Sequence, residues 1–153
     1  MIKVLFVCHG NICRSPMAEF VLRDMVVKKG WSKHFQIASA ATSTEEIGNP
    51  VHPGTRRKLR ELGIACDGKV AVQMTPKDFD RYDYLIGMDV YNIRNMRRIS
   101  GHGDDKIHLL LDFAGEHADI ADPWYTGDFE TTYQDVVRGC LGFIKQVESM
   151  IPR

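Results

Sequence analysis

The chain has 153 residues, 44% of them hydrophobic and 26% charged, as in ordinary soluble globular proteins. Twenty lysines and arginines balance twenty aspartates and glutamates, so no net charge recruits nucleic acid or an anionic membrane. The length fits one domain, residues 1–153, with a core of its own. The N-terminal apolar run is too short for a signal-peptide core or a membrane span, and four cysteines in such a chain predict free thiols. We therefore expect a cytoplasmic protein with no metal and no cofactor.

Strand and helix patterns alternate along the chain. The apolar run 3–7 predicts a strand buried on both faces, and helical spacing of apolar residues follows it from Pro16 to about Lys28. Further strands are predicted at 35–39, 82–88 and 107–111, and helices at 53–62, 90–99 and 129–147, with a polar loop at 40–53, a short helical turn opening at 75–76 and a break at 101–104. Strands separated by helices predict a parallel sheet covered on both faces.

The octapeptide Cys8-His9-Gly10-Asn11-Ile12-Cys13-Arg14-Ser15 joins the first strand to the first helix. A cysteine followed six positions later by an arginine is weak evidence alone, but the context strengthens it. Free N–H groups and the dipole at a helix N-terminus attract anions and stabilise a thiolate, so Cys8 is expected to be nucleophilic. Gly10 is expected to supply the positive φ of an anion-binding turn, and Arg14 to grip two phosphate oxygens. Ser15 can donate a hydrogen bond to the sulfur.

The segment from Cys8 to Glu19 closely resembles the phosphate-binding loop of low-molecular-weight protein tyrosine phosphatases. The likeness extends, in family order, to Ser39-Ala40-Ala41-Thr42, to Met88-Asp89 with Asn92, and to Asp122-Pro123-Trp124-Tyr125. The resemblance spans nearly the whole chain. It implies hydrolysis of phosphotyrosine on proteins through a phosphocysteine intermediate.

The resemblance also implies a role for each matched residue. Cys8 would be the nucleophile, Arg14 the phosphate clamp, and Asp122 the general acid and then the base. Asn11 would brace the loop and Ser39 would support Asn11, while Trp124 and Tyr125 would stack on an aryl phosphate. The candidate substrate- and phosphate-binding residues are His9, Gly10, Asn11, Ile12, Cys13, Ser15, Glu45, Trp124 and Tyr125, with Ser39 and Asp89 as supporting residues. For Ser39 and Asp89 a purely local turn or capping role stays open.

The predicted fold is α/β: a four-stranded parallel sheet of order 2-1-3-4 with helices on both faces, of the flavodoxin-like or Rossmann type. Expected partners are a tyrosine-phosphorylated protein substrate and a cognate tyrosine kinase. No nucleic-acid partner is expected. The chain is expected to act as a monomer or weak homodimer.

Two features bear on regulation and specificity. Cys13 places a second thiol in the loop, so oxidation is expected to form a reversible Cys8–Cys13 disulfide, whereas Cys66 and Cys140 are interpreted as packing residues. Glu45 stands where relatives of the resembled family often carry an aromatic residue. His52, Lys69 and Val72 also depart from the usual pattern, and we assign all four to the wall opposite the aromatic pair. We expect Glu45 to disfavour acidic residues beside the phosphotyrosine.

Four other functions share part of this sequence pattern. Arginine phosphatases resemble the chain but typically have threonine at the position of Ile12. Arsenate reductases of the same fold need closely spaced relay cysteines, whereas Cys66 and Cys140 are isolated. A phosphocysteine carrier protein would not need Arg14 together with Asp122. A non-catalytic phosphotyrosine-binding module is disfavoured, because no motif position required for chemistry is missing.

Overall fold

A single parallel sheet organises the computed structural model, which describes residues 1–101 and 105–152. Its strands are β1 (Ile2–Cys8), β2 (Phe35–Ala41), β3 (Tyr84–Gly87) and β4 (Ile107–Leu109). The strand order is β2-β1-β3-β4 with every neighbouring pair parallel, so the predicted order 2-1-3-4 is confirmed. Because β1 has β2 on one side and β3 on the other, the topology switches direction at its carboxyl end, where such sheets bind ligands.

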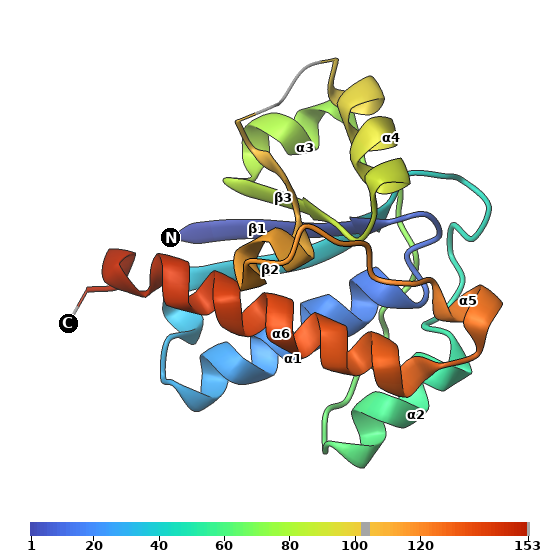
Figure 1. Ribbon diagram of the computed structural model, residues 1–153, viewed down its shortest axis with the longest axis horizontal. Helices are drawn as coiled ribbons and strands as arrows, with labels where there is room; N and C mark the ends of the chain where they lie inside the picture. The colour runs from blue at the N-terminus through green and yellow to red at the C-terminus, as the bar shows by residue number, and fades with distance from the viewer. Residues whose placement is uncertain (102–104, 153) are drawn as a thin grey trace.

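Helices cover both faces of the sheet (Figure 1). They are α1 (Arg14–Lys28), α2 (Pro53–Glu61), α3 (Pro76–Arg81), α4 (Val90–Ser100), α5 (Pro123–Thr126) and α6 (Phe129–Val147), with short 3-10 helices η1 (Ser32–His34), η2 (Leu110–Ala114) and η3 (Glu148–Met150). Helices α1, α2 and α6 form one layer, and α3 and α4 lie on the opposite face. No helix in these two described stretches is long and apolar enough to cross a membrane.

The central strand β1 is buried on both faces, as its continuous apolar run predicts. Val4 and Phe6 pack in the core under α1 and α6, whereas Leu5 and Val7 pack in the core under α3 and α4. Side chains alternate along a strand, so Cys8 faces the side of α1 and α6. Cys8, the last residue of β1, therefore lies at the carboxyl end of the sheet, and its thiol is directed toward the start of α1.

Several element boundaries differ from those expected. Leu110 and Leu111 belong to η2 instead of the fourth strand, because the chain winds into a helical turn that packs against α6. A Cβ at Gly139 would lie 2.4 Å from Leu110 Cγ, so the two segments meet without space for a side chain there. Helix α1 begins two residues earlier than Pro16, at Arg14. Gly101, with φ +80°, ends α4, and residues 102–104 of the expected break lie outside the described residues.

Candidate active site

The phosphate loop, residues 8–15, crosses from the end of β1 to the start of α1. The backbone N–H of Asn11 donates to Cys8 Sγ over 3.3 Å, and Ser15 Oγ lies 3.0 Å from the same sulfur. The predicted positive φ at Gly10 is wrong: Asn11 adopts it, with φ +58°. Asparagine tolerates this region better than most residues. At Gly10 the loop passes close to Glu46, since a Cβ there would lie 3.3 Å from Glu46 Cγ.

The strained backbone of Asn11 is held by its own side chain. Its Nδ2 donates to Ser15 Oγ over 2.8 Å and to Ser39 Oγ over 2.9 Å, and its Oδ1 accepts the N–H of Val72 over 3.1 Å. Because Ser15 Oγ accepts from Asn11, its own hydroxyl proton is available for the sulfur of Cys8. The loop is thus shaped by buried hydrogen bonds from two other segments of the chain.

Arg14 is 2% exposed and lies where three segments meet. Its guanidinium donates to Asp89 Oδ2 over 2.7 Å, to the carbonyl of Ile120 over 2.9 Å and to Asp122 Oδ2 over 3.4 Å. Burial by itself would lower the pKa of Arg14, but the electrostatic influence of Cys8 and of the carboxylates of Asp89 and Asp122 outweighs burial and raises that pKa. The arginine stays charged, and its Nε is a buried donor without a partner among the described atoms. A charged N–H donor of this kind can hydrogen-bond to an anionic ligand.

Asp89 performs both of the roles that the sequence left open. Its Oδ1 accepts the N–H of Asn92 over 2.8 Å and caps α4, while its Oδ2 binds Arg14. Asn92 completes the capping box by accepting the N–H of Asp89. Helix α4 therefore begins at the residue that orients the guanidinium of Arg14.

Sequence reasoning missed Glu19, which supports the loop from beneath. This carboxylate is 2% exposed and accepts the hydroxyl of Ser39 over 2.6 Å. Arg23 pairs with it at 2.7 Å, and Lys69 Nζ lies 3.6 Å away. Burial lowers the pKa of Lys69, although Glu19 opposes that shift. A charged residue within the apolar, buried stretch of α1 is the one sequence signal that could have revealed it.

We expect Glu19→Ala to lower the free energy of unfolding by about 3–5 kcal/mol, because it leaves the partly buried Lys69 without its carboxylate and the hydroxyl proton of Ser39 without its acceptor. Urea denaturation measures the change. The control Glu61→Ala removes an exposed carboxylate at the end of α2, and should change the same free energy by no more than about 0.5 kcal/mol. Equal effects of the two variants would contradict this account of Glu19.

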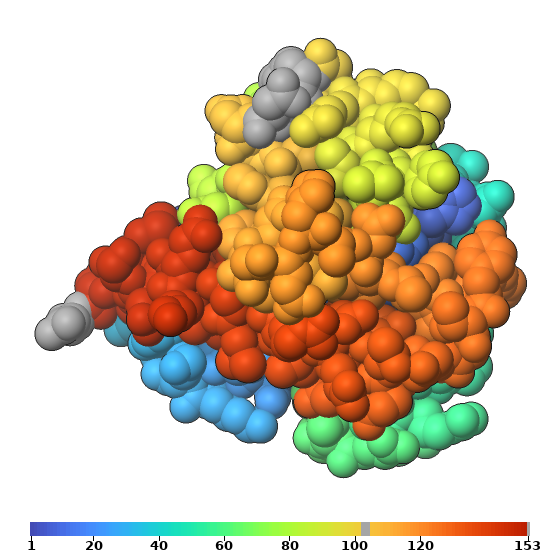
Figure 2. Space-filling view, viewed as in Figure 1, coloured from blue at the N-terminus to red at the C-terminus, as the bar shows by residue number. Residues whose placement is uncertain are grey.

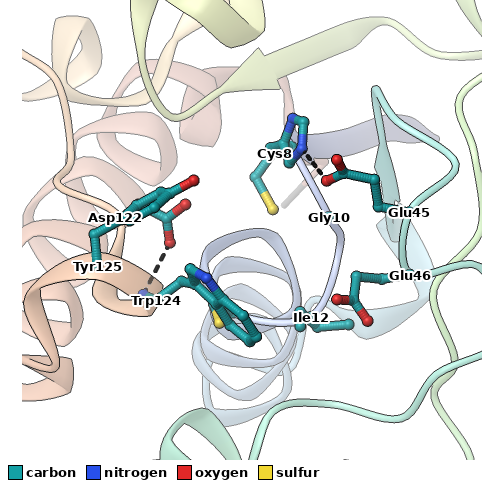
Figure 3. A pocket seen from close by; sticks show the side chains of 10 residues that line it. Cys8, Gly10, Ile12, Glu45, Glu46, Asp122, Trp124 and Tyr125 are labelled. Atoms are coloured by element: carbon teal, nitrogen blue, oxygen red, sulfur yellow. Dashed lines mark hydrogen bonds and ion pairs between the residues drawn. The ribbon is translucent and has the colours of Figure 1, made fainter.

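A cavity of about 110 Å³ opens above the sulfur of Cys8 (Figure 3). Its lining residues come from the phosphate loop, the 42–49 loop and the start of α5; they are Cys8, His9, Gly10, Ile12, Cys13, Glu45, Glu46, Asp122, Trp124 and Tyr125. Asp122 and the two aromatic residues face the sulfur from one side, and Glu45, Glu46 and Ile12 lie on the other. In Figure 2 the blue N-terminal segment reaches the surface between the yellow-green start of α4, the teal 42–49 loop and the orange segment around α5.

One side of the cavity is formed by Asp122 and the start of α5. Asp122 is the N-cap of this helix, and its Oδ1 accepts the backbone N–H of Trp124 over 3.1 Å. Its other oxygen faces Arg14. Trp124 and Tyr125 line the cavity and are 56% and 83% exposed, so both side chains remain largely accessible beside its opening. Aromatic rings in this position can stack on an aryl group.

The opposite wall differs from the expected one. Glu45 lines the cavity and bonds His9 Nε2 over 2.5 Å, a contact that ties the 42–49 loop to the phosphate loop. Among the described residues, the lining does not include His52, Lys69 or Val72, so their assignment to this wall is wrong. Lys69 and Val72 lie under the phosphate loop, on Glu19 and Asn11. The position of a residue along the chain could not show whether it lines the cavity or packs beneath the phosphate loop.

All four cysteines are free thiols and buried. Burial, with a smaller electrostatic contribution from the nearby Cys8, raises the pKa of Cys13 to about 12. Burial also raises the pKa of Cys66 and of Cys140, and Cys140 lies inside the core under α6. Over residues 1–101 and 105–152, no group of three His, Cys, Asp or Glu side chains is placed to hold a metal ion.

The fold and the site define a parallel α/β domain with a thiol-containing anion loop at the switch point of its sheet. Residues 3–152 match the family model described as low molecular weight phosphotyrosine protein phosphatase, and the chain belongs to this family. It is 44% identical over 151 residues to the low molecular weight protein-tyrosine-phosphatase YfkJ of Bacillus subtilis, covering 97% of each. It is 42% identical over 150 residues to the human low molecular weight phosphotyrosine protein phosphatase, covering 94% of each.

Solved structures agree with this family. The crystal structure of YfkJ from Bacillus subtilis superposes with a TM-score of 0.94 at 43% identity, covering 98% of this chain and 96% of that one. A Drosophila arginine phosphatase superposes with a TM-score of 0.89 at 27% identity, covering 96% of this chain and 98% of that one. The predicted family and the predicted enzyme class, phosphoric monoester hydrolase, are confirmed.

Proposed function

We propose that the chain hydrolyses phosphotyrosine monoesters on proteins through a phosphocysteine intermediate. One observation carries the proposal: Cys8 and Asp122 line the same cavity, Arg14 bonds to Asp122 beside it, and Ser15 Oγ lies within hydrogen-bond distance of the sulfur. The proposed partners are tyrosine-phosphorylated proteins and a cognate tyrosine kinase. The proposed setting is the cytoplasm, with the chain acting as a monomer or weak homodimer.

In the first step the Cys8 thiolate attacks phosphorus in line with the tyrosine oxygen. The P–S bond forms as the P–O bond breaks, and the carboxylic acid of Asp122 protonates the leaving phenoxide. The guanidinium of Arg14 and the N–H groups of the loop hold the equatorial oxygens, where charge accumulates. Asp89 and the carbonyl of Ile120 keep that guanidinium aimed at the loop.

In the second step a water molecule attacks the phosphocysteine. The carboxylate of Asp122 takes a proton from the water while the P–S bond breaks. Inorganic phosphate leaves, and the thiolate of Cys8 returns with the hydroxyl of Ser15 beside it at 3.0 Å. The same donor that steadies the attacking thiolate thus steadies it as a leaving group.

Phosphotyrosine fits the cavity better than the phosphate esters of short side chains. Cys8 is 3% exposed and its sulfur lies at the base, while the rings of Trp124 and Tyr125 stand at the opening. A long, flat aryl group can reach the base and pack against these rings. A serine phosphate is too short to do both.

A panel of matched phosphopeptides tests the proposal. We expect kcat/KM for phosphotyrosine to exceed that for phosphoserine by at least about 100-fold, and Asp122→Ala to lower the phosphotyrosine value by about 10²–10⁴-fold. A preference for phosphoserine, or no turnover of any peptide, would contradict the proposal.

An arginine phosphatase is the second candidate, because the Drosophila enzyme of that name shares the fold over nearly the whole chain. Ile12 favours phosphotyrosine, since its apolar side chain lines the cavity and offers no hydrogen bond to a guanidinium. Phosphoarginine peptides in the same panel decide between the two. A higher kcat/KM for phosphoarginine would replace our assignment.

We expect hydrogen peroxide to inactivate the enzyme reversibly. Oxidation of Cys8 gives a sulfenic acid, and the Cys13 thiol then displaces water from it to form a disulfide. Cys13 is itself a poor target for the oxidant, because its raised pKa keeps it protonated. Dithiothreitol should restore activity, and mass spectrometry should find a Cys8–Cys13 bridge. Detection of Cys8 sulfonic acid without that bridge would rule out this protection.

We expect Glu45 to shift preference away from acidic peptides. Its carboxylate lines the cavity mouth and is oriented by His9. The ratio of kcat/KM for peptides with lysine beside the phosphotyrosine to those with glutamate there should fall by about 3- to 10-fold in Glu45→Tyr, since one mouth charge contributes about 1 kcal/mol. An unchanged ratio would remove Glu45 from substrate selection.

A further inference from the structure

His52 lies behind the aromatic wall and joins three separate parts of the site. Its backbone N–H donates to the carbonyl of Ile12 in the phosphate loop over 2.8 Å. Its ring meets Trp124 edge-on, with centroids 5.6 Å apart and planes at 80°, and stacks on Phe129 at 5.1 Å and 22°. One residue therefore contacts the phosphate loop, α5 and the first turn of α6.

The ring of His52 is fixed in place by its own helix. Its Nδ1 accepts the N–H of Gly54 over 3.0 Å, which caps α2. Gly54 allows Phe129 to lie against this turn, because a Cβ there would come within 2.4 Å of the Phe129 ring. The imidazole is thus held by the cap on one side and by Phe129 on the other, and presents a rigid surface to Trp124.

Trp124 links that surface to Asp122. The backbone N–H of Trp124 donates to Asp122 Oδ1, so a movement of this residue moves the carboxylate. Helix α5 has only four residues, too few to hold its own position, and more than half of Trp124 is exposed. The position of α5 must therefore come from contacts such as the one with His52.

We propose that His52 is a positioning residue that holds Trp124, and through it the carboxylate of Asp122, at the correct distance from the phosphate loop. The inference rests on the proposed role of Asp122 as general acid. It assigns to His52 no contact with substrate, in keeping with its place outside the cavity lining.

A misplaced acid has a characteristic kinetic signature. A leaving phenoxide with a conjugate-acid pKa of about 10 needs a proton as the P–O bond breaks, whereas 2,4-dinitrophenoxide, a far weaker base, leaves without one. Loss of His52 support should therefore reduce kcat/KM for phenyl phosphate more than for 2,4-dinitrophenyl phosphate. A general loss of folded enzyme would reduce both equally.

Two variants separate the ring from the cap. His52→Asn keeps a side-chain acceptor for Gly54 and removes the ring, and should lower the ratio of kcat/KM for phenyl phosphate to that for 2,4-dinitrophenyl phosphate by about 10-fold. His52→Phe keeps the ring and removes the acceptor, and should hold the ratio within about two-fold of wild type. His34→Ala, in η1, is the control and should leave the ratio unchanged.

The outcomes are distinct. An unchanged ratio in His52→Asn, or an equal fall in His52→Phe, would overturn the positioning role of the ring. Asp122→Ala should lower the ratio most of all. If that variant leaves the ratio unchanged, the proposed function of Asp122 fails, and the failure is separate from that of His52.

Discussion

Replacement of Cys8 by serine is expected to lower kcat/KM for phosphotyrosine peptides by at least ~10⁴-fold, because a neutral hydroxyl is a far weaker nucleophile than a thiolate. Two donors surround the sulfur of Cys8: the N–H of Asn11 points at it over 3.3 Å, and Ser15 Oγ lies 3.0 Å away. A serine hydroxyl in the same place gains little from these donors, since it stays protonated at neutral pH. Steady-state turnover of p-nitrophenyl phosphate gives the same comparison.

Binding separates lost chemistry from lost structure in this variant. Inorganic phosphate should bind Cys8→Ser with a Kd within about three-fold of wild type, because the loop N–H groups and Arg14 remain in place. Cys66→Ser is the matched control, since Cys66 is a buried thiol beyond α2 and outside the cavity lining. It should retain wild-type kcat/KM. Full activity in Cys8→Ser would end the covalent mechanism.

Replacement of Arg14 by lysine is the second large effect, an expected fall of about 10³-fold in kcat/KM. Lysine keeps the charge but lacks the planar fork. The guanidinium of Arg14 contacts Asp89, the carbonyl of Ile120 and Asp122 at once. A single ammonium group cannot keep these contacts and also hold two phosphate oxygens.

Arg138→Lys controls for the chemical change itself. Arg138 also uses its fork, on Glu116 and Asp135, but at the surface of α6. This variant should keep kcat/KM within about two-fold of wild type. In contrast to Cys8→Ser, Arg14→Lys should also weaken the binding of inorganic phosphate. Wild-type phosphate affinity in Arg14→Lys would show that the clamp is not the source of binding energy.

Much of the fold could be predicted because its signals are local. The buried run before Cys8 predicted β1, and helical spacing predicted α6 over the same residues, 129–147. The strand that was expected to continue through Leu111 ends at Leu109. Leucine occurs both in buried strands and in buried helical turns, so the local sequence does not distinguish the two. The helical turn is selected by the packing of Leu110 against α6.

The phosphate loop shows the same division at the level of single residues. Its residue types and their order indicated an anion site with a thiol, and the structure places Cys8 and Asp122 in the lining of one cavity, with Arg14 bonded to Asp122. The choice of Asn11 instead of Gly10 for the positive φ was not predictable from local pattern. It depends on Ser39 and Val72, which lie 28 and 61 positions away in the chain and compensate for the strain.

By itself, therefore, the sequence determined which chemical groups the candidate site contains: a cysteine at a strand end, an arginine one loop later, and an aspartate before Pro123. The reactivity of a cysteine depends on the backbone geometry beside it, here the loop before a helix N-terminus. Because that local geometry is encoded by neighbouring residues, residue type and spacing are enough to recognise it. Only the tertiary structure decided the support. Glu19 lies under the loop and His52 against Trp124 because long-range packing of α1, α2 and α6 puts them there. Contacts between distant segments leave no periodic signal in the chain that forms them.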